Sequence, residues 1–235
     1  MNMKTIMITG ASKGIGRQTA LTLSQPDTSF ETIVVLGRQM DLLEDLVAEA
    51  QQISTDKKII PIVADLENPD VVHDVFKELD QKGVRLNAIV NNAGFTKPAL
   101  LNDTHQDDFE TTMRVNLYSP FRIIQTALRE DHPLEQIINI ASTAGINGRA
   151  GWLSYSASKA AMINMSEVLR EELKPEGIEV TCLSPGRCAT DLRKTLAPDE
   201  DPSTIMQPEQ VAGVIKLMTS DLGKLLHSIN LVVRT

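Results

Sequence analysis

The chain has 235 residues, of which 42% are hydrophobic and only 3% aromatic, so it is long enough to bury a sizeable aliphatic core. A formal net charge of −8 argues against a general nucleic-acid-binding protein, because phosphate binding needs a basic surface. Two cysteines and four scattered histidines give neither a disulfide framework nor a metal-ligand cluster. No signal peptide or membrane span is visible, so we expect a cytoplasmic protein with no metal, membrane or nucleic-acid partner.

Short β-branched runs alternate with longer helical patterns along the whole chain. Strands are expected at 4–9, 31–37, 58–64, 86–92, 135–142, 177–184 and 227–233. Helices are expected at about 15–24, 40–53, 69–81, 105–130, 151–174 and 208–220. The strands read as continuous apolar runs, which is typical of strands buried on both faces.

This order predicts an α/β fold with a single Rossmann-type, doubly wound domain over residues 1–235. The expected sheet has seven strands, is mostly parallel and carries helices on both faces. The mostly polar stretch 187–206 is the only long gap between predicted elements, and we interpret it as a substrate loop.

The stretch WLSYSASKAA, residues 152–161, places Tyr155 four residues before Lys159. In a helix these two positions share one face, one turn apart. A phenol with a pKa near 10 is a poor proton donor at neutral pH, and a nearby cation lowers that pKa. The pair is therefore a candidate general acid, although the same spacing also arises by chance.

The stretch TGASKGIG, residues 9–16, joins the first expected strand to the first helix. In an α/β sheet this turn lies at the carboxyl end of the strand, where ligands bind. Its glycines allow a pyrophosphate to approach the backbone, and the helix N-terminus offers free N–H groups. The spacing G-x-x-x-G-x-G differs from the G-x-G-x-x-G fingerprint and from a P-loop, and alone the turn could equally be structural.

Together the glycine turn and the Tyr155/Lys159 pair resemble the short-chain dehydrogenase/reductase family, and the resemblance runs in order along almost the whole chain. It includes an acid after the third strand, the NNAG motif at 91–94 and a Pro-Gly pair after the sixth strand. The cofactor-binding residues that it implies are Thr9, Gly10, Ser12, Lys13, Gly14, Ile15, Gly16, Arg38, Asp65, Leu66, Asn92, Ala93, Gly94, Tyr155, Lys159, Pro185, Gly186, Cys188 and Thr190.

The same resemblance implies hydride transfer between a nicotinamide cofactor and a carbonyl or secondary alcohol. Hydride delivery develops negative charge on oxygen, which must be protonated and held. Tyr155 would give the proton, and Lys159 would lower the pKa of Tyr155 and hydrogen-bond the nicotinamide ribose. Ser142 would hold the carbonyl oxygen, and Asn116 would position a water that connects Lys159 to solvent.

The end of the second strand, VVLGR, favours NADP(H) over NAD(H). Gly37 stands where an NAD-specific site usually places an acid, and Arg38 follows. Arg38 and Lys13 could both bond a 2′-phosphate. The alternative is that both are solvated surface charges.

The leading hypothesis is an NADP(H)-dependent carbonyl reductase that acts on a small carbonyl or alcohol substrate. A 3-oxoacyl thioester (acyl-carrier-protein) reductase is the enzymatic alternative, and an NADP(H)-sensing or scaffold protein is the alternative from another class. A sensor has no need for all four catalytic residue types. For Trp152, packing at a helix start and a substrate wall are equally expected. Arg187 could attract an anionic group or face solvent, and solvent is favoured. Cys188 is expected to be unreactive.

We also expect a homodimer or homotetramer. By resemblance, the helices at about 105–130 and 151–174 pair with their copies in a second subunit. The apolar residues expected to support this pairing are Leu117, Phe121, Ile124, Met162, Met165 and Leu169.

Overall fold

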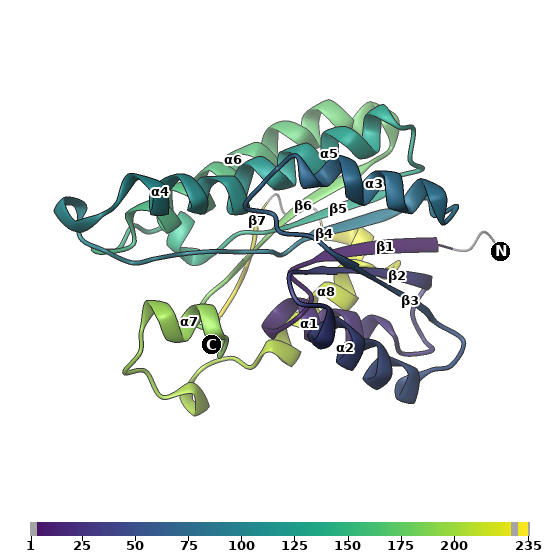
Figure 1. Cartoon of the computed structure of the whole chain (residues 1–235), viewed down its shortest axis with the longest axis horizontal. Coiled ribbons are helices and arrows are strands. Elements are labelled where there is room, and N and C mark those ends of the chain that lie inside the picture. The colour runs from purple at the N-terminus through teal and green to yellow at the C-terminus, as the bar shows by residue number, and fades with distance from the viewer. Residues whose placement is uncertain (1–3, 227–229, 235) are drawn as a thin grey trace.

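The computed structural model describes residues 4–226 and 230–234, and its strands form one seven-stranded sheet (Figure 1). The strands are β1 (Lys4–Thr9), β2 (Phe30–Gly37), β3 (Lys58–Val63), β4 (Ala88–Asn91), β5 (Gln136–Ile140), β6 (Glu179–Pro185) and β7 (Asn230–Val233). Their order is β3-β2-β1-β4-β5-β6-β7, and every neighbouring pair is parallel. The order reverses between β1 and β4, which is where an open α/β sheet binds its ligand.

Helices cover both faces of the sheet. They are α1 (Gly14–Leu23), α2 (Met40–Ile53), α3 (Val71–Gln81), α4 (Gln106–Met113), α5 (Ser119–Arg129), α6 (Leu153–Leu173), α7 (Asp191–Leu196) and α8 (Pro208–Met218). Figure 1 shows α1, α2 and α8 on one face and α3, α5 and α6 on the other. α7 stands apart from both layers, beyond the end of the sheet near the C-terminus.

The alternation of side chains along β1 explains why two apolar layers form. Ile6 and Ile8 are fully buried against α1, α2 and α8, whereas Met7 between them is fully buried against α3, α5 and the end of α6. Successive residues of a strand point to opposite faces, so one apolar run serves both layers.

The predicted fold class and the seven strands are confirmed for the described residues, and most element ends agree within two residues. The first three residues of the predicted last strand, 227–229, lie outside the described residues. The helical pattern predicted at 105–130 is confirmed for 106–129, where a π-helical turn (Arg114–Tyr118) joins α4 directly to α5. Within this turn the buried Asn116 side chain bonds to Phe95 and Ser158, so tertiary hydrogen bonds accompany the change of helix type.

Two expectations about the long connections fail. The stretch 187–206 is partly helical, since it contains α7 and a 3₁₀ turn (Pro202–Thr204). Thr190 caps α7 by accepting a hydrogen bond from the Arg193 N–H. A second long connection runs from β4 to α4 with only a 3₁₀ turn (Leu101–Asp103), so 187–206 is not the only such gap.

Candidate active site

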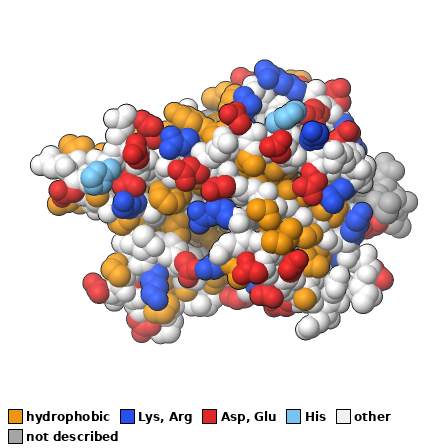
Figure 2. All heavy atoms as spheres, viewed as in Figure 1, with side chains coloured by type: hydrophobic (Ala, Val, Ile, Leu, Met, Phe, Trp, Pro, Cys, Tyr) orange, Lys and Arg blue, Asp and Glu red, His pale blue; other side chains and the backbone are white. Residues whose placement is uncertain are grey.

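A cavity of about 480 Å³ opens at the carboxyl ends of the strands, between the sheet and α7. Most of the predicted site residues line it, with only Thr9, Gly16 and Asn116 lying behind its wall. Figure 2 shows this side of the molecule hollowed between the helical layer and the α7 segment, with basic side chains beside the hollow. The topology therefore brings the predicted residues together from elements spread along the whole chain.

The glycine turn is held by close backbone contacts. Gly10 and Gly14 have positive φ angles of 66° and 55°. A Cβ on Gly16 would lie 2.3 Å from the Gly10 carbonyl oxygen and 2.4 Å from Asn92 Nδ2. Because these glycines have no side chains, main chain forms the cavity wall here, and a pyrophosphate could approach it closely.

Thr9 and Asn92 join the glycine turn to the end of β4. The Thr9 hydroxyl oxygen accepts hydrogen bonds from the main-chain N–H groups of Asn92 (3.0 Å) and Ala93 (2.9 Å). The Asn92 side chain donates in return to the carbonyl oxygens of Thr9 (2.9 Å) and Gly10 (3.2 Å). These two predicted residues therefore fix the shape of the cavity rather than offering free polar groups to it.

The end of β2 forms the next part of the wall. A Cβ on Gly37 would lie 2.0 Å from Ser12 Oγ, so the glycine allows the turn to pack on β2. Arg38 is exposed and lines the cavity. Lys13 Nζ lies 3.3 Å from Asp191 Oδ2, which links the glycine turn to α7 by an exposed ion pair.

Asp65 and Leu66 follow β3 at the same end of the cavity. The Asp65 carboxylate is exposed and accepts a hydrogen bond from the Glu67 N–H. Leu66 is buried, and its carbonyl oxygen accepts a hydrogen bond from Ser119.

Tyr155 and Lys159 lie together at the other end of the cavity, and both are almost completely buried. The Lys159 ammonium lies 5.9 Å from the centre of the Tyr155 ring, as the i, i+4 spacing predicts. It donates a hydrogen bond to the Ile140 carbonyl oxygen at 2.7 Å, and burial lowers the pKa of Lys159 to about 8. The Lys159 side chain thus approaches the cavity from beneath the phenol.

The prediction that Lys159 lowers the pKa of Tyr155 is wrong for this structure. Burial raises the pKa of the phenol, because the charged phenolate loses its hydration. A hydrogen bond with Ser142 and the charge of Arg193 oppose this rise, but neither outweighs burial. The Tyr155 phenol is therefore fully protonated at neutral pH.

Ser142 follows β5 and lines the cavity beside Tyr155. Its Oγ also accepts a hydrogen bond from the Ala144 N–H. Asn116 lies behind the wall: its side-chain oxygen accepts from the Phe95 N–H, and its amide donates to the Phe95 carbonyl oxygen and to Ser158 Oγ. These contacts use both N–H donors of the Asn116 amide, so its side chain has no donor left for the predicted water.

The segment after β6 closes the cavity from the side of the C-terminus. The Gly186 N–H donates to the Val233 carbonyl oxygen, and Cys188 pairs with Met206 in a short parallel bridge. Burial raises the pKa of the Cys188 thiol to about 11, so it stays protonated, in agreement with the expected lack of reactivity. Pro185 and Thr190 line the cavity with them.

Sequence reasoning singled out Arg187 in the substrate-facing part of the cavity but did not identify Arg149 or Arg193. Arg149 and Arg193 lie over the Trp152 ring at 5.0 and 5.4 Å, and the Trp152 ring is edge-on to the Tyr155 ring at 6.4 Å. Trp152 thus packs at the start of α6 and also lines the cavity. Arg187 is half exposed, in agreement with the favoured expectation that it faces solvent, but it also lines the cavity and its guanidinium lies 3.4 Å from Glu200.

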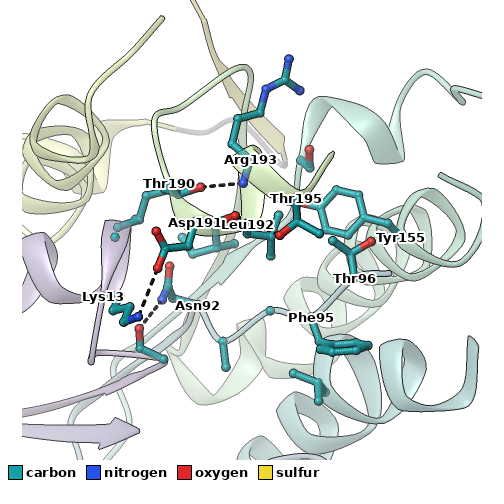
Figure 3. Close-up of a pocket in the computed structure, with 18 of the residues that line it drawn as sticks. Lys13, Asn92, Phe95, Thr96, Tyr155, Thr190, Asp191, Leu192, Arg193 and Thr195 are labelled. Atoms are coloured by element: carbon teal, nitrogen blue, oxygen red, sulfur yellow. Dashed lines mark hydrogen bonds and ion pairs between the residues drawn. The ribbon is translucent and has the colours of Figure 1, made fainter. Parts of the chain in front are cut away.

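Two further residues that sequence reasoning missed are Phe95 and Thr96, which follow the NNAG motif (Figure 3). The Thr96 side chain is buried, and its hydroxyl has no hydrogen-bond partner among the described residues. Figure 3 also shows Asp191, Leu192 and Thr195 between the Lys13 end and the Tyr155 end of the cavity. No sequence motif marks these positions.

The geometry of the glycine turn and of the Tyr155/Lys159 pair agrees with the comparison to known families. The model of the short chain dehydrogenase family matches residues 4–201. The chain belongs to the short-chain dehydrogenase family. This short-chain dehydrogenase is therefore an oxidoreductase.

Relatives match this short-chain dehydrogenase over nearly their whole length. A 3-oxoacyl-[acyl-carrier-protein] reductase of Synechocystis is 32% identical over 94% of this chain and 91% of the relative. A reductase with the same description from Thermotoga maritima is 32% identical over 93% of this chain and 91% of the relative. A short chain dehydrogenase from Burkholderia cenocepacia in complex with NADP is 25% identical, with a TM-score of 0.86 over 98% of this chain and 96% of that one.

Two features of this short-chain dehydrogenase bear on its expected partners. In the part of the chain that the structure describes, no helix combines the length and the apolarity that crossing a bilayer requires. Within the same residues, no three histidine, cysteine or acidic side chains gather where they could hold a metal ion.

Proposed function

We propose that this protein is an NADP(H)-dependent carbonyl reductase, which reduces a carbonyl compound to the corresponding secondary alcohol. The observation that carries the proposal is the buried, protonated Tyr155 beside Ser142 and above Lys159, in one cavity with the glycine turn. A protonated phenol is the form that can donate a proton, so the site is prepared for reduction.

The cofactor end of the cavity fits a dinucleotide. Side chains at Gly10 or Gly16 would collide with the main chain, so these glycines preserve the room that a pyrophosphate needs at the start of α1. Gly37 places no carboxylate at the end of β2, and the exposed Arg38 guanidinium is available for a 2′-phosphate. The similar structure from Burkholderia cenocepacia, described in complex with NADP, supports the same choice.

The residues of this chain then have distinct tasks. Bound NADPH would supply the hydride. Ser142 holds the carbonyl oxygen of the substrate, and Tyr155 donates its proton to that oxygen as negative charge develops there. Lys159 holds the positive charge beneath the phenol and hydrogen-bonds the nicotinamide ribose, for which its ammonium has two donors beyond the one given to Ile140.

A 3-oxoacyl thioester reductase is the second candidate, and the descriptions of the two relatives at 32% identity favour it. The chemistry at Tyr155 is the same in both cases, so the catalytic residues do not separate them. The two differ in whether the rest of the substrate is a small molecule or a chain attached to a carrier protein.

The test is a panel of ketones, aldehydes and 3-oxoacyl thioesters offered with NADPH and with NADH, followed by absorbance at the reduced nicotinamide band. We expect turnover of small ketones with NADPH, and a lower kcat/KM with NADH. Turnover of 3-oxoacyl thioesters alone would favour the second candidate. Cofactor binding without turnover of any compound would support a sensing protein instead.

We further propose that two copies associate through α5 and α6. Phe121, Tyr118 and Val168 are large apolar or aromatic residues that these helices and the π-helical turn leave exposed. The expectation for Ile124 and Met162 is wrong, because both are buried in the interior of the subunit. Leu117, Met165 and Leu169 are partly buried. A monomeric mass by light scattering at micromolar concentration would contradict this association.

A further inference from the structure

The wall that faces Tyr155 carries an excess of positive charge. Arg149, Arg187 and Arg193 all line the cavity there. Glu200 is shared by two of them: it binds Arg193 through two hydrogen bonds, of 2.5 and 2.7 Å, and lies 3.4 Å from Arg187. This excess is notable in a chain whose formal net charge is −8.

Arg149 is the arginine of this wall without an acidic partner. Among the residues that the structure describes, no carboxylate lies within ion-pair distance of it, and its recorded contact is the face of Trp152 at 5.0 Å. The indole face holds the guanidinium by a cation–π contact but leaves its N–H groups unpaired. An arginine fork of this kind is suited to a carboxylate.

The other carboxylates that line the cavity cannot serve as that partner. Asp65 and Glu67 follow the edge strand β3, which three other strands separate from β5 in the sheet. Asp191 faces Lys13 at the glycine turn (Figure 3). A negative charge beside Arg149 would therefore have to come from a ligand.

Arg149 is also close enough to the reacting group to select a substrate. Its guanidinium lies 5.0 Å from the centre of the Trp152 ring, and the Tyr155 ring is edge-on to the same indole at 6.4 Å. The charge of Arg193, on the same indole, already acts on the Tyr155 phenol. A substrate carbonyl at Tyr155 and an anionic group at Arg149 would thus belong to one small molecule.

From this arrangement we propose that Arg149, placed by Trp152, binds a carboxylate of the substrate, so that the compound reduced here is a small oxo acid. The inference rests on the proposed carbonyl reduction and adds the substrate class to it. Arg193 supports the site by its positive charge and by packing against the Trp152 ring. Glu200 holds Arg193 in place through an ion pair.

The first experiment compares oxo acids with their methyl esters. A series of 2-, 3-, 4- and 5-oxo acids and the matching esters is assayed with NADPH for the native enzyme, Arg149→Gln and Lys194→Gln. Lys194 is the matched control, because it is an exposed cation of α7 that does not line the cavity. We expect the native enzyme to prefer at least one acid over its ester by about tenfold or more in kcat/KM, which is the value of a partly exposed charge-assisted bond.

In Arg149→Gln that preference should fall about tenfold, mainly through KM, and in Lys194→Gln it should persist. Equal use of acid and ester by the native enzyme would overturn the proposal, and so would a preference that survives Arg149→Gln. The proposal would also be overturned if kcat/KM depended on Arg149 for a phosphopantetheine thioester but for no small oxo acid. Arg149 would then bind the phosphate of a carrier arm and not a substrate carboxylate.

The second experiment reads binding without turnover. Trp152 is the only tryptophan of the chain, so its fluorescence reports on this wall alone. We expect saturable quenching by 3-hydroxybutanoate and none by its amide, with the response lost in Arg149→Gln and kept in Lys194→Gln. If the acid quenches Trp152 as expected but no ketone is reduced, the proposal of carbonyl reduction fails and the carboxylate site stands. If ketones are reduced but the acid and its amide quench Trp152 equally, the carboxylate site fails and carbonyl reduction stands.

Discussion

The two ends of the cavity are built in different ways. At the cofactor end, the wall is main chain, and a single added Cβ at Gly16 would collide with backbone 2.3 Å away. At the substrate end, the loop before α6 contains Gly148, where a Cβ would meet nothing within 4 Å, and the wall consists of long side chains such as Arg149 and Arg193. The first end is therefore fixed by close packing, whereas the second is set by charge and by the placement of side chains.

Buried charge adds to this contrast. At the cofactor end the cations Lys13 and Arg38 are exposed and keep most of their hydration. At the substrate end, which also holds Tyr155 and Lys159 and is called the catalytic end below, the Lys159 ammonium is buried, and that burial lowers its pKa to about 8. The buried charge at the catalytic end thus lowers the stability of the folded protein, which the exposed cations of the cofactor end do not do. Such a loss of stability is common at functional sites.

The largest expected effect lies at the catalytic end. Tyr155→Phe keeps the ring that packs on Trp152 but removes the proton donor. We expect carbonyl reduction to fall by about 10²- to 10⁴-fold, the range for a lost general acid, with little change in NADPH affinity. Steady-state rates and NADPH titration measure the two quantities, and near-normal turnover would show that Tyr155 is not the acid.

The next effect tests the charges of the cofactor end. Lys13→Ala combined with Arg38→Ala should remove the preference for NADPH over NADH, which we place at roughly 10²- to 10³-fold from two partly exposed charge-assisted bonds. The ratio of kcat/KM for the two cofactors measures it. Lys58→Ala combined with Arg129→Ala removes the same charge from exposed positions outside the cavity and should leave the ratio unchanged. A native enzyme that prefers NADH would contradict the assignment.

Packing at the two ends is compared by adding one methyl group to each. Gly16→Ala should lower the free energy of unfolding by about 1–3 kcal/mol, because the Cβ must displace the Gly10 carbonyl and Asn92. Gly148→Ala has open space and should leave stability nearly unchanged. Chemical denaturation of both variants gives the comparison, and equal losses would mean that the cofactor end is no more tightly packed than the loop around Gly148.

The smallest effect concerns the buried ammonium and depends on pH. Because the pKa of Lys159 is about 8 in the folded protein and 10.5 as its ordinary value, the unfolded chain binds more protons between these values. The folded state is therefore penalised by this group below pH 8, and the penalty disappears as the pH rises from about 8 to 10.5. Lys159→Met removes it.

For the cofactor-free protein we expect Lys159→Met to be more stable than the native chain at pH 7, by on the order of 1–3 kcal/mol. The difference should shrink as the pH rises above 8. Denaturation curves at pH 7, 8.5 and 10 measure this trend, and a variant that is less stable than the native chain at pH 7 would contradict a buried, costly charge.

The contrast between the two ends also explains what the sequence could predict. Gly10 and Gly14 adopt positive φ angles, and Gly16 has no room for a side chain. The turn requires glycine at these positions, so the glycine spacing in the sequence is enough to predict it. The sheet was predictable because its strands are continuous apolar runs, and the i, i+4 rule correctly placed Lys159 next to Tyr155.

Other features depend on contacts between segments far apart in the chain. The Lys159 ammonium bonds to Ile140 on β5, and the pKa of Tyr155 follows from burial by the whole wall, neither of which local spacing specifies. Arg193 is placed by Glu200, and Arg149 by the face of Trp152. Nothing in the sequence near either arginine marks it as part of a site.

The central claim, hydride transfer from NADPH to a substrate carbonyl, is tested most directly by isotope transfer. The native enzyme is given a ketone that it consumes, together with NADPH carrying deuterium at C4 in separate pro-R and pro-S forms, and the alcohol is analysed by mass spectrometry and NMR. We predict that deuterium from one of the two forms appears on the carbinol carbon, and that Tyr155→Phe slows its appearance by the factor that it slows turnover. An alcohol that carries no deuterium from either form would contradict the account.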